Sequence, residues 1–91
     1  MSALRAVAEG RVQGVGYRAF VVDEAQARGL TGWVRNLRSG AVEMVLSGGE
    51  AEIAGMIAAC RRGPRFASVT RLETSPVADE GWRDFSVRPT A

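Results

Sequence analysis

One stretch near the N-terminus carries the residue types from which an anion site can be built. Residues 10–18 read Gly-Arg-Val-Gln-Gly-Val-Gly-Tyr-Arg. Gly14 and Gly16 can adopt backbone dihedrals that are closed to other residues, and they let a backbone approach a ligand closely. Arg18 carries a planar guanidinium whose N–H groups match phosphate oxygens. The same residues are also consistent with a tight turn beside a surface arginine, and taken alone they leave both interpretations open.

Asn36 is a second candidate for chemistry. Its side-chain amide can hold a water molecule, because it offers both donors and an acceptor. Asparagine is also frequent in turns for backbone reasons, and Asn36 is followed by the turn-like run Leu-Arg-Ser-Gly. On this residue alone, the turn role is favoured.

The composition excludes several other kinds of chemistry. All twelve basic residues are arginines, and the chain has neither lysine nor histidine. These absences exclude a P-loop lysine, Schiff-base chemistry, a histidine general base and a histidine-ligated metal. The acidic residues show no spacing typical of a metal loop, so no metal and no cofactor are predicted. The formal net charge of +2 argues against a strongly basic nucleic-acid-binding tail.

The remaining polar and reactive residues predict ordinary structural roles. The single cysteine, Cys60, cannot form an internal disulfide, and its place on the apolar stripe of a predicted helix favours a buried thiol over a nucleophile. Glu43, Asp79 and Glu80 are expected to be solvated surface residues. No apolar run approaches the eighteen residues of a membrane span, and the N-terminus lacks the apolar region of a signal peptide. We therefore expect a cytoplasmic protein without a membrane partner.

The elements that must position the candidate residues can be followed along the chain. Residues 3–11 predict a strand, and a helix is expected from about Arg18 to a stop at Gly29. Its apolar face comprises Val21, Val22 and Ala25. The glycine loop therefore leaves a strand and enters a helix N-terminus, where unpaired N–H groups and the helix dipole favour an anion.

The second half of the chain adds a hairpin, a helix and two strands. Residues 31–36 and 41–46 predict strands, and their short link permits only an antiparallel hairpin. Ser47 with Glu50 three residues later matches a capping box that opens a helix. The apolar stripe of that helix comprises Ile53, Met56, Ile57 and Cys60, and Gly63-Pro64 ends it. Two more strands are expected at 66–74 and 85–87.

This order of elements predicts a fold class. Residues 1–91 suit one small domain of the α+β class, a ferredoxin-like βαββαβ sandwich. We expect an antiparallel sheet with both helices on one face and a short extra C-terminal strand. Many unrelated functions use this fold, so the fold alone does not assign an activity.

Two other interpretations of the same residues are disfavoured. Gly14 to Ala19 fits the Gly-x-Gly-x-x-Gly/Ala dinucleotide fingerprint. That site needs a parallel βαβ unit and an acid about twenty residues later, whereas here a hairpin follows and Asn36 stands near the acid's place. An RNA-binding sheet would need an aromatic signature on a central strand, and Trp33 is the only aromatic residue in the clearly predicted strands. No nucleic-acid partner is predicted.

Two sequence blocks together resemble a known family. Gly-Arg-Val-Gln-Gly-Val-Gly-Tyr-Arg at 10–18, followed by Gly-Leu-Thr-Gly-Trp-Val-Arg-Asn at 29–36, strongly resembles the acylphosphatases. The resemblance covers nearly the whole chain, including Gly63-Pro64 and the Phe-Ser-Val strand at 85–87. It implies a small ferredoxin-like enzyme that hydrolyses acyl phosphates, the mixed anhydrides of a carboxylic and a phosphoric acid. It further implies hydrolysis without metal or covalent intermediate, at a site that also binds inorganic phosphate or sulfate. The small net charge and the lack of an obvious apolar surface patch favour a monomer.

The resemblance also implies roles for individual residues. Arg18 would be the phosphate-binding catalytic arginine, and Asn36 the residue that orients the attacking water. The cradle whose amides hold the phosphoryl oxygens would comprise Gln13, Gly14, Val15, Gly16 and Tyr17. Tyr17, Leu37 and Arg65 depart from the common family pattern, where Phe, a small polar residue and Pro are frequent. A catalytically silent anion-binding domain with the same cradle remains the main alternative, and turnover would separate the two.

Overall fold

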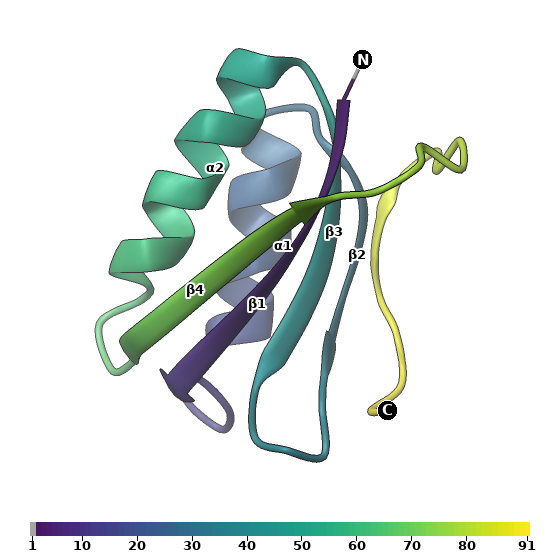
Figure 1. The fold of residues 1–91 in the computed structure, drawn as a ribbon. Helices are drawn as coiled ribbons and strands as arrows, with labels where there is room; N and C mark the ends of the chain where they lie inside the picture. The colour runs from purple at the N-terminus through teal and green to yellow at the C-terminus, as the bar shows by residue number, and fades with distance from the viewer. Residues whose placement is uncertain (1) are drawn as a thin grey trace.

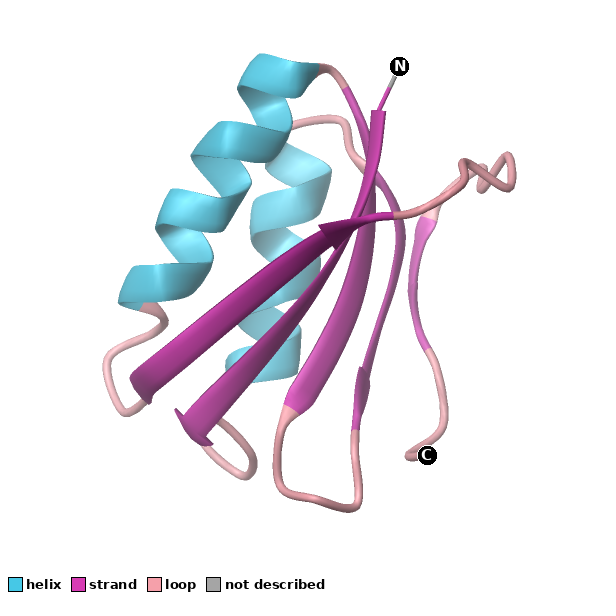
Figure 2. Ribbon diagram, viewed as in Figure 1, coloured by secondary structure: helices cyan, strands magenta, loops and turns pink. Residues whose placement is uncertain are grey.

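The computed structural model describes residues 2–91 and contains one five-stranded sheet with two helices on one face (Figures 1 and 2). The elements are β1 (Ser2–Arg11), α1 (Tyr17–Ala27), β2 (Thr31–Asn36), β3 (Val42–Gly48), α2 (Glu50–Arg62), β4 (Ser68–Pro76) and β5 (Phe85–Val87). The strand order is β4-β1-β3-β2-β5. The predicted α+β, ferredoxin-like order of elements is confirmed. Neither helix in residues 2–91 is long and apolar enough to span a membrane.

The predicted antiparallel sheet is confirmed for four strands, and the short extra C-terminal strand, β5, adds one parallel pairing. β1, β2, β3 and β4 pair antiparallel, but β5 runs parallel to β2. β4 ends at the end of the sheet where β2 begins. The link over residues 77–84 crosses to the opposite edge there, so β5 enters beside β2 in the same direction (Figure 1). The link is anchored on the way, because the Val77 amide donates to the Ala3 carbonyl at 3.1 Å.

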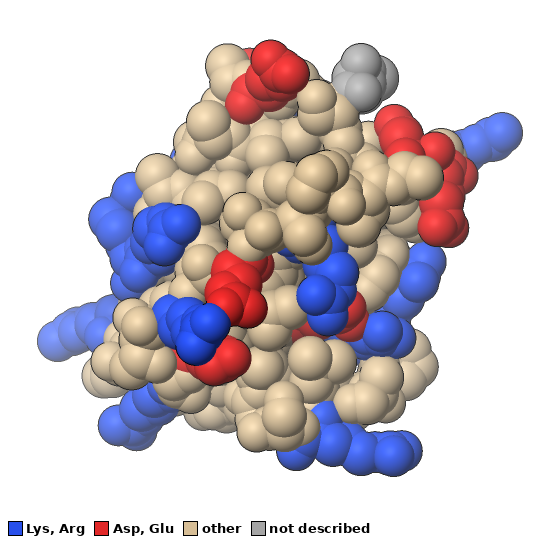
Figure 3. All heavy atoms as spheres, in the orientation of Figure 1, with Lys and Arg blue, Asp and Glu red and all other residues tan. Residues whose placement is uncertain are grey.

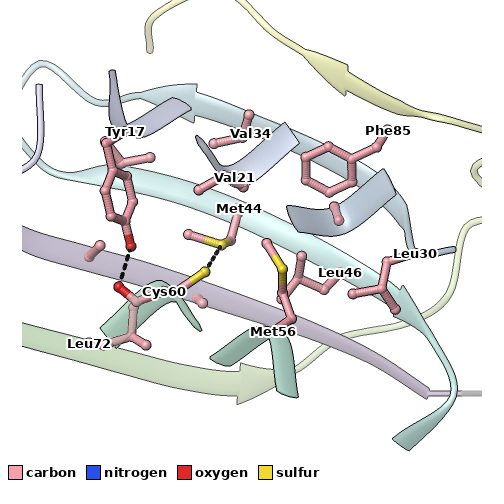
Figure 4. Close-up of a cluster of buried hydrophobic side chains, with 14 of the residues drawn as sticks. Tyr17, Val21, Leu30, Val34, Met44, Leu46, Met56, Cys60, Leu72 and Phe85 are labelled. Carbon is pink, nitrogen blue, oxygen red and sulfur yellow. Dashed lines mark hydrogen bonds between the residues drawn. The ribbon is translucent and has the colours of Figure 1, made fainter. Parts of the chain in front are cut away.

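The core lies between the sheet and the two helices (Figure 4). α1 buries Tyr17, Val21 and Ala25, and α2 buries Ile53, Met56, Ala59 and Cys60. The strands contribute mainly Ala6, Ala8, Val34, Val42, Met44, Leu46, Leu72 and Phe85. The alternation predicted for β3 is confirmed, since Val42, Met44 and Leu46 face the helices. Both faces of this central strand are nevertheless buried.

Tyr17 joins the start of α1 to the end of α2. Its hydroxyl donates to the Cys60 carbonyl at 2.8 Å, and its side chain is buried (Figure 4). Within a regular helix, that carbonyl would accept from the amide of residue 64, but Pro64 has no N–H. The tyrosine hydroxyl, which phenylalanine lacks, therefore satisfies a carbonyl that the helix end leaves open. This contact fixes the first residue of α1 beneath the glycine loop.

The capping box predicted at Ser47 is not present. Ser47 lies in β3, and the N-cap of α2 is Gly49, without a side-chain cap hydrogen bond. The Ser47 hydroxyl instead donates to the Asp79 carboxylate at 2.9 Å. Asp79 is exposed, as expected, but it also anchors the link between β4 and β5. Ser47 pairs with Ala3 of β1 and therefore stays in the sheet. Strand pairing thus prevails over the side-chain cap that the local sequence predicted.

Glu43 is not a solvated surface residue, contrary to the prediction from its outward alternation. It is only 5% exposed and accepts hydrogen bonds from the guanidinium Nε of Arg5 at 2.5 Å and of Arg35 at 2.6 Å. Trp33 lies on the same face, with the guanidinium groups of Arg35 and Arg88 over its ring at 4.8 and 4.6 Å. The long arginine stems and the indole cover this part of the sheet, although no helix packs against it.

The buried Glu43 carboxylate predicts a dependence of stability on pH. Burial alone would raise the pKa of Glu43, but the hydrogen bonds and charges of Arg5 and Arg35 outweigh it and hold the pKa below its ordinary value of 4.5. A carboxyl whose pKa is lowered by folding stabilises the protein above its unfolded pKa. That contribution is lost as the pH falls through the folded pKa. We expect Glu43→Gln to lower the free energy of unfolding by about 1–3 kcal/mol at pH 7.

Urea unfolding at pH 7 and at successively lower values below 4.5 checks this prediction. The difference between wild type and Glu43→Gln should shrink as the pH falls, because the wild-type carboxylate becomes protonated. Glu73→Gln is the matched control: its carboxylate is 58% exposed and pairs with Arg71, so we expect a cost below about 1 kcal/mol. An equal cost at all these pH values would contradict the assigned ion pairs.

Candidate active site

The loop between β1 and α1 has the conformation that its glycines permit. Gly14 and Gly16 have φ values of +72° and +80°, in the left-handed region that side chains disfavour. A Cβ added at either position would meet no other atom within 4 Å. The two glycines are thus required by backbone geometry, and they leave open space beside the chain. Gly16 is also the N-cap of α1.

Backbone N–H groups without protein acceptors gather at this loop. In the described chain, none of the N–H groups of residues 13–19 donates to a carbonyl or side chain, and the first such donor of the helix is Phe20, which bonds the Gly16 carbonyl at 3.0 Å. The α1 N-cap offers no side-chain acceptor either. A helix start normally leaves unpaired donors, and here the preceding loop extends the row. Such a row of oriented N–H groups, with the positive end of a helix dipole behind it, favours an anion.

A pocket of about 180 Å³ opens at this row of donors. Its lining comprises Val12, Gly14, Gly16, Tyr17, Arg18, Ala19 and Asn36. The structure therefore brings Arg18 and Asn36 into one pocket with three of the predicted cradle residues. Gln13 and Val15 do not line it: the Gln13 side chain turns toward the β2–β3 hairpin, and Val15 packs against the core.

Two residues of this lining were not predicted from the sequence. Val12 is almost fully buried and forms part of the pocket wall directly after β1. Ala19 lies in the first turn of α1, and its N–H is among the free donors. Only the continuation of unpaired N–H groups into the first helical turn could have indicated Ala19. The small side chain of Ala19 leaves the approach to these donors uncovered.

Asn36 reaches the pocket because β2 ends beside the loop. In the sheet it pairs with Val42 of β3, and on the other side its carbonyl accepts from the Ala91 amide at 3.1 Å. The backbone is thus held from both neighbouring segments. The side-chain Oδ1 is buried and has no hydrogen-bond partner within the described chain. An unpartnered buried acceptor is costly, so an O–H donor that reached this oxygen would stabilise it.

The electrostatics of the pocket suit an anion. Arg18 supplies the charged group of the lining, and no carboxylate lines it. In Figure 3, arginines lie along the lower margin, the end at which the loop and the hairpin lie in Figure 1, and also along the left margin and the right edge, whereas acids gather at the top and the upper right. Two larger hollows are less suitable. One of about 270 Å³ contains Glu9, and one of about 470 Å³ is mainly apolar and contains Glu50.

The side chains behind the pocket offer neither a nucleophile nor a metal site. Burial raises the pKa of the Cys60 thiol to about 11, and burial likewise raises the pKa of Tyr17. Cys60 is fully buried with its Sγ at 3.6 Å from Met44 Sδ, so the structure confirms the prediction of a core thiol. Among residues 2–91, no three Cys, Asp or Glu side chains gather in a way that could hold a metal ion.

Comparison with known proteins places this chain in a family. The acylphosphatase family model matches residues 4–87. An acylphosphatase of Azorhizobium caulinodans is 52% identical over 84 residues, which cover 88% of this chain and 90% of that protein. An acylphosphatase 2 of Ralstonia nicotianae is 53% identical over 83 residues, covering 90% of this chain and 87% of that one. The crystal structure of acylphosphatase from Bacillus subtilis aligns with a TM-score of 0.94 and 38% identity, covering 97% of this chain and 99% of that one. The chain therefore belongs to the acylphosphatase family.

Proposed function

We propose that this chain hydrolyses acyl phosphates to a carboxylate and inorganic phosphate, without metal, cofactor or covalent intermediate, as a single-domain monomer. The observation that carries the proposal is the pocket that combines free N–H groups, the Arg18 guanidinium and the unpartnered Asn36 Oδ1. Family membership supports the reaction, and the pocket supports the roles of the residues. The phosphoryl group would lie against the donors, with the acyl group directed toward solvent.

The substrate class follows from the leaving group. An acyl phosphate expels a carboxylate whose conjugate acid has a pKa near that of a glutamic acid, about 4.3. It leaves without being protonated, so the site needs no general acid. An alkyl phosphate ester would expel a far more basic alkoxide and would need an acid or a metal ion. The pocket lining holds neither a carboxyl nor an imidazole, which favours the acyl phosphate.

Binding and charge stabilisation would come from Arg18 and the backbone donors. Phosphoryl transfer depends mainly on positioning and on stabilising charge on the equatorial oxygens of the transition state. The N–H groups are fixed by the backbone of the loop and the first turn of α1, so they need no reorganisation during the reaction. Arg18 would add a positive charge and a planar pair of donors at the mouth of this cradle.

Asn36 would orient the attacking water. The water would donate a hydrogen bond to the buried Oδ1 and direct its oxygen lone pair at phosphorus, opposite the acyl oxygen. As the new P–O bond forms, the bond to the acyl oxygen breaks and its electron pair leaves with the carboxylate. A carboxamide is no base, so we assign the water's proton to an oxygen of the substrate phosphate. The products are the carboxylate and inorganic phosphate.

Hydrolysis of benzoyl phosphate in excess chelator tests the proposal directly. We expect steady turnover by the purified wild-type protein, inhibited competitively by inorganic phosphate. When the same assay is run from pH 5 to 8, the pH profile of kcat should show no ionisation of an enzyme group. The reason is that no side chain in the sequence has an ordinary pKa in that range. The Cys60 thiol lies above the range, since burial raises its pKa to about 11.

Two results would overturn parts of this proposal. Phosphate binding without turnover by a folded protein would leave a silent anion-binding domain. An ionisation between pH 5 and 8 that does not follow the substrate's own titration would show that a group of the enzyme accepts or donates the proton. That result would contradict the transfer of the water's proton to the substrate phosphate.

A further inference from the structure

The Gln13 side chain forms a bridge between the two halves of the pocket. Gln13 belongs to the glycine loop, but its Nε2 donates to the carbonyls of Leu37 and Ala41, each at 2.8 Å. These carbonyls lie more than twenty residues further along the chain, in the link between β2 and β3. The bridge is partly buried, and so it is partly shielded from competing water.

The two acceptor carbonyls lie at the two ends of the link in the hairpin that carries Asn36. Leu37 directly follows Asn36, and its N–H donates to the Ala41 carbonyl at 2.8 Å. Gln13 therefore binds both ends of the link, one next to β2 and the other next to β3. In residues 2–91, these two hydrogen bonds are the only ones that join residues 12–16 to residues 36–41. One side chain thus adds a direct link between the loop and the hairpin to the pairing of β1 with β3.

The chemistry of the amide excludes a direct contact of its nitrogen with a phosphate. A carboxamide nitrogen has two hydrogens, and the two carbonyls accept both of them. The remaining Oε1 is an acceptor and would repel an anion. The Gln13 side chain also does not line the pocket. Any direct contribution of Gln13 to phosphate binding must therefore come from its backbone N–H.

We infer that Gln13 is a positioning residue that fixes the distance between the phosphoryl cradle and the amide of Asn36. This inference rests on the proposed function, in which Asn36 orients the water and the cradle holds phosphorus. Nucleophile and phosphorus are then bound by different segments, and only their relative placement makes the attack productive. A displacement of about 1 Å between reacting groups costs on the order of a hundredfold in rate.

Substitution of Gln13 by Met tests the inference, because methionine has a similar length and no hydrogen-bond donor. We expect kcat for benzoyl phosphate to fall about 10- to 100-fold, while the inhibition constant of inorganic phosphate changes less than about threefold. Gln26→Met is the matched control, since Gln26 is the only other glutamine and lies exposed on α1; it should retain wild-type kcat. Gln13→Asn provides the same test if the Met variant does not fold, because its amide is one methylene too short to reach both carbonyls.

A double variant separates positioning from a general structural effect. If Gln13 acts through Asn36, then Gln13→Met should lower kcat by less than about threefold in an Asn36→Ala background. If Asn36→Ala is itself slow and the losses of kcat caused by the two substitutions multiply in the double variant, the inference is overturned. The proposed function would then still stand. Wild-type kcat in Asn36→Ala would overturn the water-orienting role and the inference together. A weakening of phosphate binding in Gln13→Met that matches its loss of kcat would also overturn it.

Discussion

Replacement of Arg18 by Ala is expected to lower kcat/KM for benzoyl phosphate by about two to three orders of magnitude, the usual cost of removing one donor that stabilises transition-state charge. Arg18 is the charged residue of the pocket lining. Its loss would leave only neutral N–H groups against a dianionic phosphoryl group. Inorganic phosphate should bind more weakly in the same variant, because the guanidinium contacts the ground state and the transition state alike.

The measurements are kcat and KM for benzoyl phosphate and the inhibition constant of inorganic phosphate, with folding checked by circular dichroism. Arg83→Ala is the matched control: Arg83 is exposed in the link between β4 and β5 and lies outside the pocket. Arg18→Lys should recover only part of the activity, since it restores the charge without the planar fork. Activity within about threefold of wild type in Arg18→Ala would remove Arg18 from the mechanism.

Much of the fold could be predicted because local signals and packing agree. The bounds of β2 and β5 match those predicted, and the apolar stripe of α2 faces the core. β4 begins at Ser68, two residues after the predicted start at Phe66. The reason is a turn in which the Ala67 N–H bonds the Pro64 carbonyl at 3.0 Å. A difference of two residues changes where the strand begins and leaves the order of the elements unchanged.

The wrong predictions share a physical cause. Ser47 fits a helix cap locally, yet sheet pairing places it in β3. Glu43 alternates outward, yet Arg5 and Arg35 come from other strands to bury it. The direction of β5 was not predicted, and its parallel pairing likewise depends on which edge the chain reaches after β4. Each outcome depends on contacts between residues distant in sequence, and periodicity cannot report these.

The candidate site divides in the same way. The glycines, Arg18 and the helix start form a continuous stretch, so the sequence indicates their chemistry without knowledge of the fold. Asn36 comes from another element; taken alone it favoured a turn role, and the resemblance to a family gave it the water-orienting one. The structure adds the shared pocket and the buried Oδ1. The bridge from Gln13 to the hairpin was not predicted. Its acceptors are backbone carbonyls, which every residue has, so no residue type at positions 37 and 41 indicates the contact.

Replacement of Asn36 by Ala is the second large expected effect, and it should differ in kind from that of Arg18. We expect kcat to fall about 100- to 1,000-fold, because the water loses the acceptor that orients it. The inhibition constant of inorganic phosphate should stay within about threefold of wild type, since the donors of residues 13–19 and Arg18 are intact. Phosphate binding that collapses as it does in Arg18→Ala would contradict this division of roles.

Asn36→Asp sharpens the test, because the new carboxylate has nearly the shape of the amide. It keeps an acceptor for the water but brings a negative charge into the pocket with the phosphoryl group. Like charges repel strongly where water is excluded. We therefore expect Asn36→Asp to weaken phosphate binding at neutral pH and to regain affinity as the pH falls and the carboxyl is protonated, whereas Asn36→Ala should show neither effect. If both variants bound phosphate with wild-type affinity at every pH, Asn36 would lie too far from the phosphate to direct a water at phosphorus.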